Sequence, residues 1–318
     1  MAHAMVSLLF VSLFVAPFQL VSAGTILYDG RAPLSLKSAD LDASNDPFLT
    51  GVKGTEAASH YTAFLGHSVP ATPLWNKLSR VPLEQAVSVT IDNSSVFYPG
   101  GNNPQFGFRR TELIAQKNKD HSGLNQVLEV GTTVFHFSIK KDLTRPLNYD
   151  HEYQIVFIEP NDGTHVFGVQ LGSPFTNPTG RLPAKDAHSF KVLDHSLNVL
   201  FTTPFLPETW HNFAVQVDWD NRTLAVFFSK DGAPLKPVTK VVPNPTVQPG
   251  AAGQGDFHVG VLKLPLVDPA DTPANQGDVV HHGTQEGSTE GLFYSGIFVE
   301  DVKGGVTVAP RNFVKPLV

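Results

Sequence analysis

Two short segments of the sequence each place one glutamate among apolar and β-branched neighbours, in the pattern of a β-strand. They are Phe106-Gly-Phe-Arg-Arg-Thr-Glu-Leu-Ile114 and Glu152-Tyr-Gln-Ile-Val-Phe-Ile158. Side chains alternate between the two faces of a strand, so Arg110 and Glu112 share a face. By the same rule Glu152 and Gln154 share a face. Polar groups in such strands are either satisfied structural groups or the floor of a polar cleft.

A pair of carboxyl groups on one polar face can hydrolyse a glycosidic bond. One carboxylic acid protonates the leaving oxygen, and the second acts as base or nucleophile. Carboxyl separations of about 5–5.5 Å accompany retention and about 6.5–9.5 Å accompany inversion. Arg110 complicates the assignment, because a cation beside Glu112 favours the ionised carboxylate. Three alternatives stay open: Arg110 points elsewhere, it pairs with substrate, or Glu112 is the base.

Other candidate residues are fewer. His211 begins a strongly apolar strand and is a candidate for proton transfer or a sugar contact, although a structural histidine is the plainer interpretation. His281 and His282 lie in a polar loop, where Asp278 or Glu286 could complete a metal site, but nothing fixes the geometry. We expect no metal and no cofactor. The sequence has no Gly-x-Ser-x-Gly elbow, phosphate loop or dinucleotide fingerprint.

The first 23 residues read as a secretory signal peptide. An apolar run from Val6 to Val15 precedes the small residues Val21-Ser-Ala23, and the run is too short to span a bilayer. We therefore expect a secreted, extracellular protein with no membrane contact after cleavage. Asn93 and Asn221 begin N-glycosylation triplets, which fits a glycoprotein.

Composition narrows the class of protein further. Among 318 residues there is no cysteine, so stability must come from a large packed core rather than from disulfides. The net charge is −6, and only 16% of the residues are charged. Such a weakly charged, mildly acidic chain is a poor binder of the negatively charged backbone of nucleic acids. Residues 24–318 show no clear linker, and we expect a single domain and a monomer.

The elements that must position these residues are short strands bounded by Gly, Pro, Asn and Asp. The predicted strands are Val87–Ile91, Phe106–Ala115, Gln126–Val130, Thr133–Lys140, Tyr153–Ile158, Val166–Leu171, Lys191–Leu193, Asn198–Phe201, Asn212–Trp219, Leu224–Ser229, Phe257–Leu264 and Gly291–Val299. This pattern favours an all-β jelly roll or concanavalin-like sandwich with extensive loops. The long polar segments Pro234–Gly255 and Pro265–Thr289 could rim a groove.

The sequence resembles glycoside hydrolase family 131, the secreted fungal β-glucanases, over about Gly24 to Phe313. The resemblance rests on four segments: Gly24-Thr-Ile-Leu-Tyr-Asp-Gly-Arg31, Phe108-Arg-Arg-Thr-Glu-Leu113, Glu152-Tyr-Gln154 and Thr209-Trp-His-Asn-Phe-Ala-Val-Gln-Val-Asp-Trp219. It implies one β-jelly-roll catalytic domain with an open cleft. It also implies hydrolysis of β-1,3-, β-1,6- and β-1,4-linked glucans, with Glu112 and Glu152 as the catalytic carboxyls. We expect Glu112 to be the acid, Glu152 the base, and the outcome inversion. Arg110 and Gln154 are expected to contact the sugar.

Two other functions remain as alternatives. Arg110-Thr-Glu-Leu113 is also similar to the motif of jelly-roll polysaccharide lyases, which act on polyuronates such as alginate or glucuronan. Those enzymes carry a catalytic tyrosine on a late strand, and the corresponding Phe257–Leu264 has none. The other alternative is a non-catalytic glucan-binding protein of the cell wall, in which both glutamates would be structural or ligand-binding.

Overall fold

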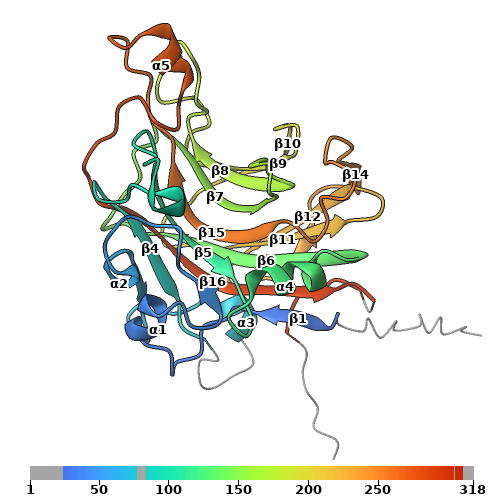
Figure 1. Cartoon of the computed structure of the whole chain (residues 1–318). Helices are drawn as coiled ribbons and strands as arrows, with labels where there is room; N and C mark the ends of the chain where they lie inside the picture. Colours follow the sequence, from blue (N-terminus) through green and yellow to red (C-terminus); the bar gives the residue numbers. More distant parts are fainter. Residues whose placement is uncertain (1–23, 77–83, 304, 311–318) are drawn as a thin grey trace, which may run out of the picture.

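The computed structural model describes residues 24–76, 84–303 and 305–310, and the predicted signal peptide lies outside these residues. Two antiparallel β-sheets make up most of the described chain, and they pack face to face (Figure 1). The prediction of an all-β sandwich is therefore confirmed.

The first sheet, sheet A, has nine strands in the described residues, with the order β13-β12-β11-β6-β16-β4-β3; β1 pairs with β16 and β14 with β12. Its strands are β1 (Ile26–Asp29), β3 (Thr62–Phe64), β4 (Val87–Ile91), β6 (Thr132–Lys141), β11 (His211–Asp218), β12 (Thr223–Lys230), β13 (Lys236–Pro237), β14 (Val242–Pro243) and β16 (Glu290–Asp301). The chain crosses repeatedly between this sheet and its partner.

The second sheet, sheet B, has seven strands in the described residues, with the order β10-β9-β8-β7-β15-β5-β2. Its strands are β2 (Phe48–Leu49), β5 (Arg109–Ala115), β7 (Glu152–Glu159), β8 (Phe167–Gly172), β9 (Ser189–Asp194), β10 (Val199–Pro204) and β15 (Asp256–Lys263). The two glutamate-bearing segments of the sequence thus form β5 and β7, and β15 lies between them.

The core lies between the sheets and follows from the alternation along each strand. On β6, Phe135, Phe137 and Ile139 point inward and are almost fully buried. Phe257 and Val259 of β15 meet them from sheet B. Burial of this much apolar surface is the main stabilising contribution in a chain without cysteines.

Helices are short in the described residues: α1 (Ser38–Asp42), α2 (Ala58–Tyr61), α3 (Pro73–Asn76), α4 (His121–Leu128), α5 (Pro273–Gly277) and the 3-10 turn η1 (Pro99–Gly101). The predicted strand Gln126–Val130 is wrong, since α4 occupies most of it. The Asp120 side chain accepts a hydrogen bond from the backbone N–H of Gly123, and this N-cap starts the helix. None of the helices in the described ranges is long and apolar enough to cross a membrane.

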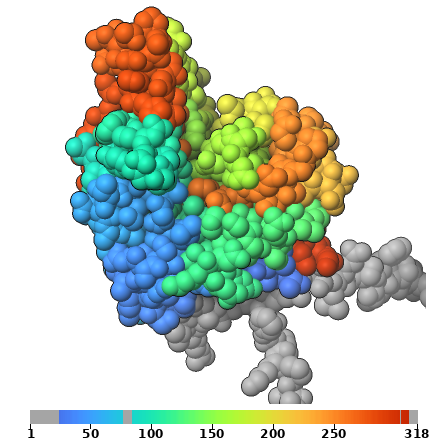
Figure 2. Space-filling view, viewed as in Figure 1, coloured from blue at the N-terminus to red at the C-terminus, as the bar shows by residue number. Residues whose placement is uncertain are grey.

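Loops rise at both ends of the strands of sheet B. At one end, residues 173–188 and 265–289 form what we call the tower, in which the Asn177 side chain donates to the Gln276 carbonyl oxygen at 3.1 Å. At the other end, residues 194–198 and 244–254 form the lobe, where the Ser196 and Thr246 hydroxyls are 2.8 Å apart. The space-filling view shows a notch between the tower and the rest of sheet B's loops (Figure 2).

Candidate active site

The outer face of sheet B, which looks away from the core, collects the polar side chains of its central strands. On β5, Leu113 and Ala115 join the core. Arg110 and Glu112 therefore point to the outer face. On β7 the inward residues include Tyr153, which leaves Glu152 and Gln154 on that same outer face. Both glutamates therefore lie on the outer face of one sheet, on β5 and β7, with β15 between them.

Glu112 is locked into a charged cluster. Nε of Arg110 donates to Oε1 of Glu112 at 2.7 Å, and Nη2 donates to Oε2 at 2.8 Å. His258 on β15 adds a third contact, with Nδ1 at 2.6 Å from Oε2. The carboxyl is fully buried, which alone would raise its pKa, but Arg110 and His258 overcome this and lower the pKa to about 2. Of the three alternatives, the first does not hold, because Arg110 points to Glu112; an ionised Glu112 is consistent with the third, in which Glu112 is the base.

Gly260 makes room for this cluster. It lies directly across from Glu112 in the β15–β5 ladder. A Cβ atom at Gly260 would lie 2.3 Å from the Thr111 carbonyl oxygen and 2.7 Å from the Glu112 Cα. Only glycine lets the two strands approach this closely.

Glu112 fixes the orientation of the His258 ring. An ionised carboxylate can only accept, so Nδ1 of His258 donates to it. The other ring nitrogen, Nε2, has no hydrogen-bond partner within the described part of the chain. The ring stacks on Phe157 at 4.7 Å between centroids, and Phe157 stacks on His165 at 4.1 Å. This arrangement is that of a histidine base oriented by a carboxylate.

Glu159, at the end of β7, belongs to the same cluster. One of its oxygens lies 3.8 Å from Nη2 of Arg110, the nitrogen that also donates to Glu112. The nearest oxygens of the two carboxyls are therefore no more than about 6.6 Å apart, the sum of those two contacts. Burial raises the pKa of Glu159, although His258 and Arg110 partly oppose the effect. The cluster thus pairs one ionised carboxylate with one that holds its proton to higher pH.

Glu152 lies nearer the tower and has different partners. Its Oε1 accepts from the Gln154 side chain at 2.9 Å, and its Oε2 accepts from the Phe175 backbone N–H at 2.8 Å. It lines a small hollow with Asp150 and Leu266. Phe175 and Leu266 both belong to the tower, so Glu152 lies at the junction between the outer face of sheet B and the tower.

A row of side chains crosses the outer face at right angles to the strands. Residues paired in register across five strands are Arg110, Leu262, Gln154, Gln170 and Lys191. Adjacent strands are about 4.8 Å apart, so the row extends for roughly 20 Å. The Gln170 amide makes no side-chain hydrogen bond to another described residue, which leaves it available to a ligand.

A buried ionic lock fastens the tower to the sandwich. Nζ of Lys263, almost fully buried, donates to Glu286 at 2.5 Å and to Glu290 at 2.7 Å. His151 contacts Glu286 at 2.9 Å, and the Tyr153 hydroxyl bonds Glu290. Lys263 follows Leu262 on β15. The strand that contributes Leu262 to the outer face of sheet B therefore also contributes the lysine that binds Glu286 of the tower.

His211 does not reach this face. It lies on β11 of sheet A, is fully buried, and packs against Phe190 and Phe205 in the core. Burial lowers its pKa to about 4, so it is neutral. A side chain sealed in the core cannot touch a sugar or its water, and this contradicts the expectation that His211 takes part in catalysis.

The side chains considered for a metal have other contacts. His281 bonds Asp278 at 2.8 Å, whereas Glu286 is held by Lys263. Within the described ranges, no group of three or more His, Asp or Glu side chains is arranged to hold a metal ion.

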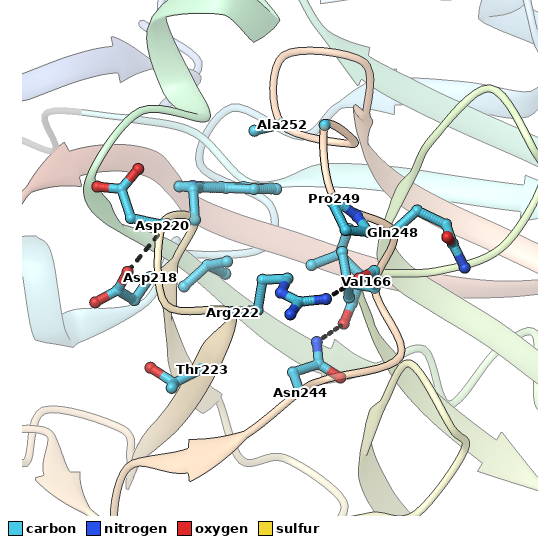
Figure 3. Close-up of a pocket in the computed structure, with 13 residues that line it drawn as sticks. Val166, Asp218, Asp220, Arg222, Thr223, Asn244, Gln248, Pro249 and Ala252 are labelled. Atoms are coloured by element: carbon cyan, nitrogen blue, oxygen red, sulfur yellow. Dashed lines mark hydrogen bonds between the residues drawn. The ribbon is translucent and has the colours of Figure 1, made fainter.

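A further cavity has a lining that includes none of the residues of the cluster. It has a volume of about 430 Å³ and opens beside the β11–β12 turn (Figure 3). Two of its polar side chains are bonded within the protein: Arg222 donates to the Val247 carbonyl oxygen at 3.0 Å, and Asn244 donates to that of Val166 at 2.7 Å. Asn221, in the same turn, donates to Asp218 at 2.9 Å. We assign no chemistry to this cavity.

Sequence reasoning missed two members of the cluster, His258 and Glu159. His258 stands in the predicted strand Phe257–Leu264, and alternation alone places it opposite Phe257 and Val259, on the polar side. Glu159 directly follows the predicted strand Tyr153–Ile158. Both residues could have been found by asking which titratable groups share a face with Glu112 and Glu152.

Comparison with known proteins agrees with this architecture. Residues 26–305 match the model of the glycoside hydrolase 131 catalytic N-terminal domain. The structure resembles the catalytic domain of a glycoside hydrolase family 131 protein from Coprinopsis cinerea, with 24% identity, a TM-score of 0.62, and coverage of 91% of this chain and 99% of that one. It also resembles a GH131 β-glucanase catalytic domain from Podospora anserina, with 22% identity, a TM-score of 0.64, and coverage of 90% and 99%.

No curated protein matches the chain. The family model nevertheless spans most of the sequence, and the sandwich aligns with both fungal structures over nearly their whole length. The chain therefore belongs to glycoside hydrolase family 131, a β-glucanase family of glycoside hydrolases.

Proposed function

We propose that this protein is a secreted enzyme that hydrolyses β-1,3-, β-1,6- and β-1,4-linked glucans on the outer face of sheet B. One observation carries the proposal: an ionised Glu112 that orients His258 on a face whose neighbouring strand supplies further carboxyls. A hollow lies between the tower and the lobe (Figure 2), and the similar structure from Podospora anserina is that of a β-glucanase.

The charges favour one division of labour. Glu112 cannot donate a proton at neutral pH, because Arg110 and His258 hold its pKa near 2. It therefore belongs to the base side of the reaction, and we assign the donor role to Glu152, the reverse of the order expected from sequence. Nε2 of His258 would accept the proton of the attacking water, with Glu112 stabilising the resulting imidazolium.

In this scheme the water oxygen forms a bond to the anomeric carbon as the bond from that carbon to the glycosidic oxygen breaks. The electron pair of the broken bond stays on the leaving oxygen, which takes its proton from Glu152. The water proton goes to His258. All groups are regenerated by proton exchange with solvent.

The spacing of the strands argues against a retaining pair of Glu112 and Glu152. Glu112 pairs with Gly260 on β15, and the Glu152 carbonyl oxygen accepts from Leu264 four positions further along. The glutamates are two strands apart, so their Cα atoms are separated by on the order of 15 Å. This gap is far longer than the short contact of a retaining pair, and inversion remains our proposal.

The proposed substrate contacts are made by polar side-chain atoms of the outer face that have no hydrogen-bond partner within the described residues. The amide oxygen of Gln154 is free to accept from a sugar hydroxyl, since its amide nitrogen is engaged with Glu152. Arg110 is bonded on two nitrogens to Glu112, and we propose that it acts chiefly by fixing that carboxylate. Secretion and glycosylation at Asn93 and Asn221 remain proposals drawn from the sequence.

The lyase alternative is less consistent with these contacts. A lyase needs a cation free to neutralise a uronate carboxyl, whereas Arg110 already has a carboxylate partner inside the protein. Phe257–Leu264, now β15, offers His258 but no tyrosine to the face.

The test incubates the purified protein with a panel of β-glucans and with polyuronates. Reducing ends and the ultraviolet absorbance of unsaturated products are followed together. We expect reducing ends from β-glucan without absorbance, and their loss in Glu112→Gln. Glu300→Gln, which removes a buried carboxylate from the other sheet, is the matched control. Absorbance from polyuronate alone would make the protein a lyase, and no product from any polysaccharide would favour a binding protein.

A further inference from the structure

Two exposed aromatic rings stand on the loop that leads into β5. Tyr98 is 37% exposed and Phe106 is 55% exposed, and they are the aromatic members of the exposed large apolar side chains in the described residues. Their centroids are 6.4 Å apart in an edge-to-face arrangement. Contiguous exposed apolar surface is one of the marks of a ligand-binding groove.

The loop holds these rings in a fixed position. The Gly107 backbone N–H donates to the Val280 carbonyl oxygen in the tower at 2.9 Å. Nη1 of Arg109 donates to the Phe106 carbonyl oxygen at 3.0 Å. A Cβ at Gly107 would lie 2.1 Å from the Val279 carbonyl oxygen, so the loop is seated directly against the tower. A surface prepared in this way binds a ligand without first having to be ordered.

The aromatic pair is continuous with the row that crosses the floor. Gln105 accepts from Nη1 of Arg110 at 3.3 Å, and its backbone N–H donates to the Phe97 carbonyl oxygen. The Phe97 ring lies 5.5 Å from the Arg110 guanidinium carbon. Arg110 is the first member of the row that continues through Gln154 and Gln170. The loop that carries the two rings therefore meets this row at Arg110.

We propose that Tyr98 and Phe106 form a distal subsite for a glucose unit of a β-glucan chain that lies across the strands of sheet B. This inference rests on the proposed function. The axial C–H groups of β-glucose make its two faces apolar, and such a face packs on an aromatic ring while the equatorial hydroxyls stay in water. The occupant is a polymer rather than a single sugar, because the rings lie beyond the floor that carries the catalytic groups.

The subsite predicts that affinity depends on chain length. A long glucan occupies both the floor and the rings, whereas a short oligosaccharide bound at the catalytic groups leaves the rings empty. Loss of an aromatic contact worth about 0.5–1.5 kcal/mol corresponds to roughly two- to tenfold in affinity.

The experiment compares the parent with Phe106→Ala, Phe106→Trp and the control Val130→Ala, whose side chain is 65% exposed after α4. We measure kcat and KM on a soluble β-glucan and on a glucan trisaccharide. Phe106→Ala should raise KM for the polymer roughly two- to tenfold, with kcat and the trisaccharide kinetics unchanged. Phe106→Trp should restore the polymer KM. An unchanged polymer KM, or an equal loss on both substrates, would overturn the subsite.

A binding measurement separates this inference from the proposed function. Affinity electrophoresis through gels with embedded β-glucan needs no turnover. If the parent cleaves nothing but is retarded, and Phe106→Ala is not, the subsite stands while the hydrolase assignment fails. If the parent hydrolyses glucan and both proteins are retarded equally, the subsite fails alone.

Discussion

The outer faces of the two sheets carry similar charged side chains but use them differently. On sheet A, His136 contacts Glu300 at 2.9 Å, and Glu300 also accepts from Thr307; all of this is covered by α3 and the C-terminal segment, with Trp75 packed on the His136 ring. On sheet B, Glu112 has equally complete partners, but the side chain of the neighbouring Glu159 is 29% exposed, whereas His136 and Glu300 on sheet A are almost fully buried. The two faces therefore differ in access: the protein encloses the pair on sheet A, whereas the cluster on sheet B reaches the surface through Glu159.

The strongest test of this difference is the pair Glu112→Gln and Glu300→Gln. Each removes a buried carboxylate from a histidine, so each should destabilise the fold, by about 3–5 kcal/mol where a charge is left uncompensated. Only Glu112→Gln should also lower kcat per folded molecule, by roughly 10²–10⁴-fold. Urea unfolding and active-fraction kinetics measure the two effects. A comparable loss of kcat in Glu300→Gln would remove the distinction between the faces.

A second comparison uses the histidines. His258→Asn keeps a polar side chain beside Glu112 but removes the nitrogen proposed to accept the proton, and we expect a loss of kcat on the order of 10²-fold or more. His136→Asn should leave kcat unchanged. Urea unfolding of both variants separates a loss of kcat from a loss of folded protein. A loss of kcat in His136→Asn as large as that in His258→Asn would contradict the assignment.

Two buried glutamates should respond to pH with opposite signs. Glu112 has its pKa lowered from 4.5 to about 2, so its contribution to stability is present above pH 4.5 and is lost as the pH falls toward 2. Burial raises the pKa of Glu84, on the sheet A side, from 4.5 to about 7, so stability falls as the pH rises from 4.5 to 7. Each slope is at most about 1.4 kcal/mol per pH unit.

Urea unfolding between pH 3 and 8 should therefore show Glu84→Gln gaining stability over the parent at pH 8. Glu112→Gln should lose part of the acid dependence instead. Equal pH dependence of the parent and Glu84→Gln would show that this carboxyl ionises normally in the folded protein.

The smallest expected effect concerns the amides. Gln170→Ala should raise KM for β-glucan by a few-fold without changing kcat, since a typical hydrogen bond contributes about 1 kcal/mol. Gln216→Ala, on the outer face of sheet A, is the control, and both variants should unfold like the parent. A KM change of the same size in both variants would mean that the row across sheet B has no particular role in binding.

Much of this arrangement follows from alternation along single strands. The pattern placed Glu112 beside Arg110 and put Glu152 and Gln154 on one face, and the structure agrees. Alternation also places His211 on the same face as Phe213 and Val215, which lie in the core. The expectation that His211 takes part in catalysis was wrong because it rested on the chemistry of the imidazole and not on the face of the strand.

The rest depended on pairing between distant segments. His258 meets Glu112 only because β15 pairs with β5, and nothing local in either strand specifies that partner. The helix α4 was missed for a different reason: the Asp120 cap outweighs the β-branched residues that follow it. Loop paths such as that of the tower are set by long-range contacts, here the bonds from Lys263 to Glu286 and Glu290.

The lack of cysteine in a sandwich bounded by a tower and a lobe has a practical consequence. Any thiol introduced by mutation would be the sole reactive sulfur of its kind in the molecule, so fluorescent dyes could be attached without background labelling. Cysteines at the exposed positions Ala270 in the tower and Leu197 in the lobe would report the width of the cleft by energy transfer. The same chain would fold without oxidative pairing, which lets such a reporter be produced in a reducing cytoplasm.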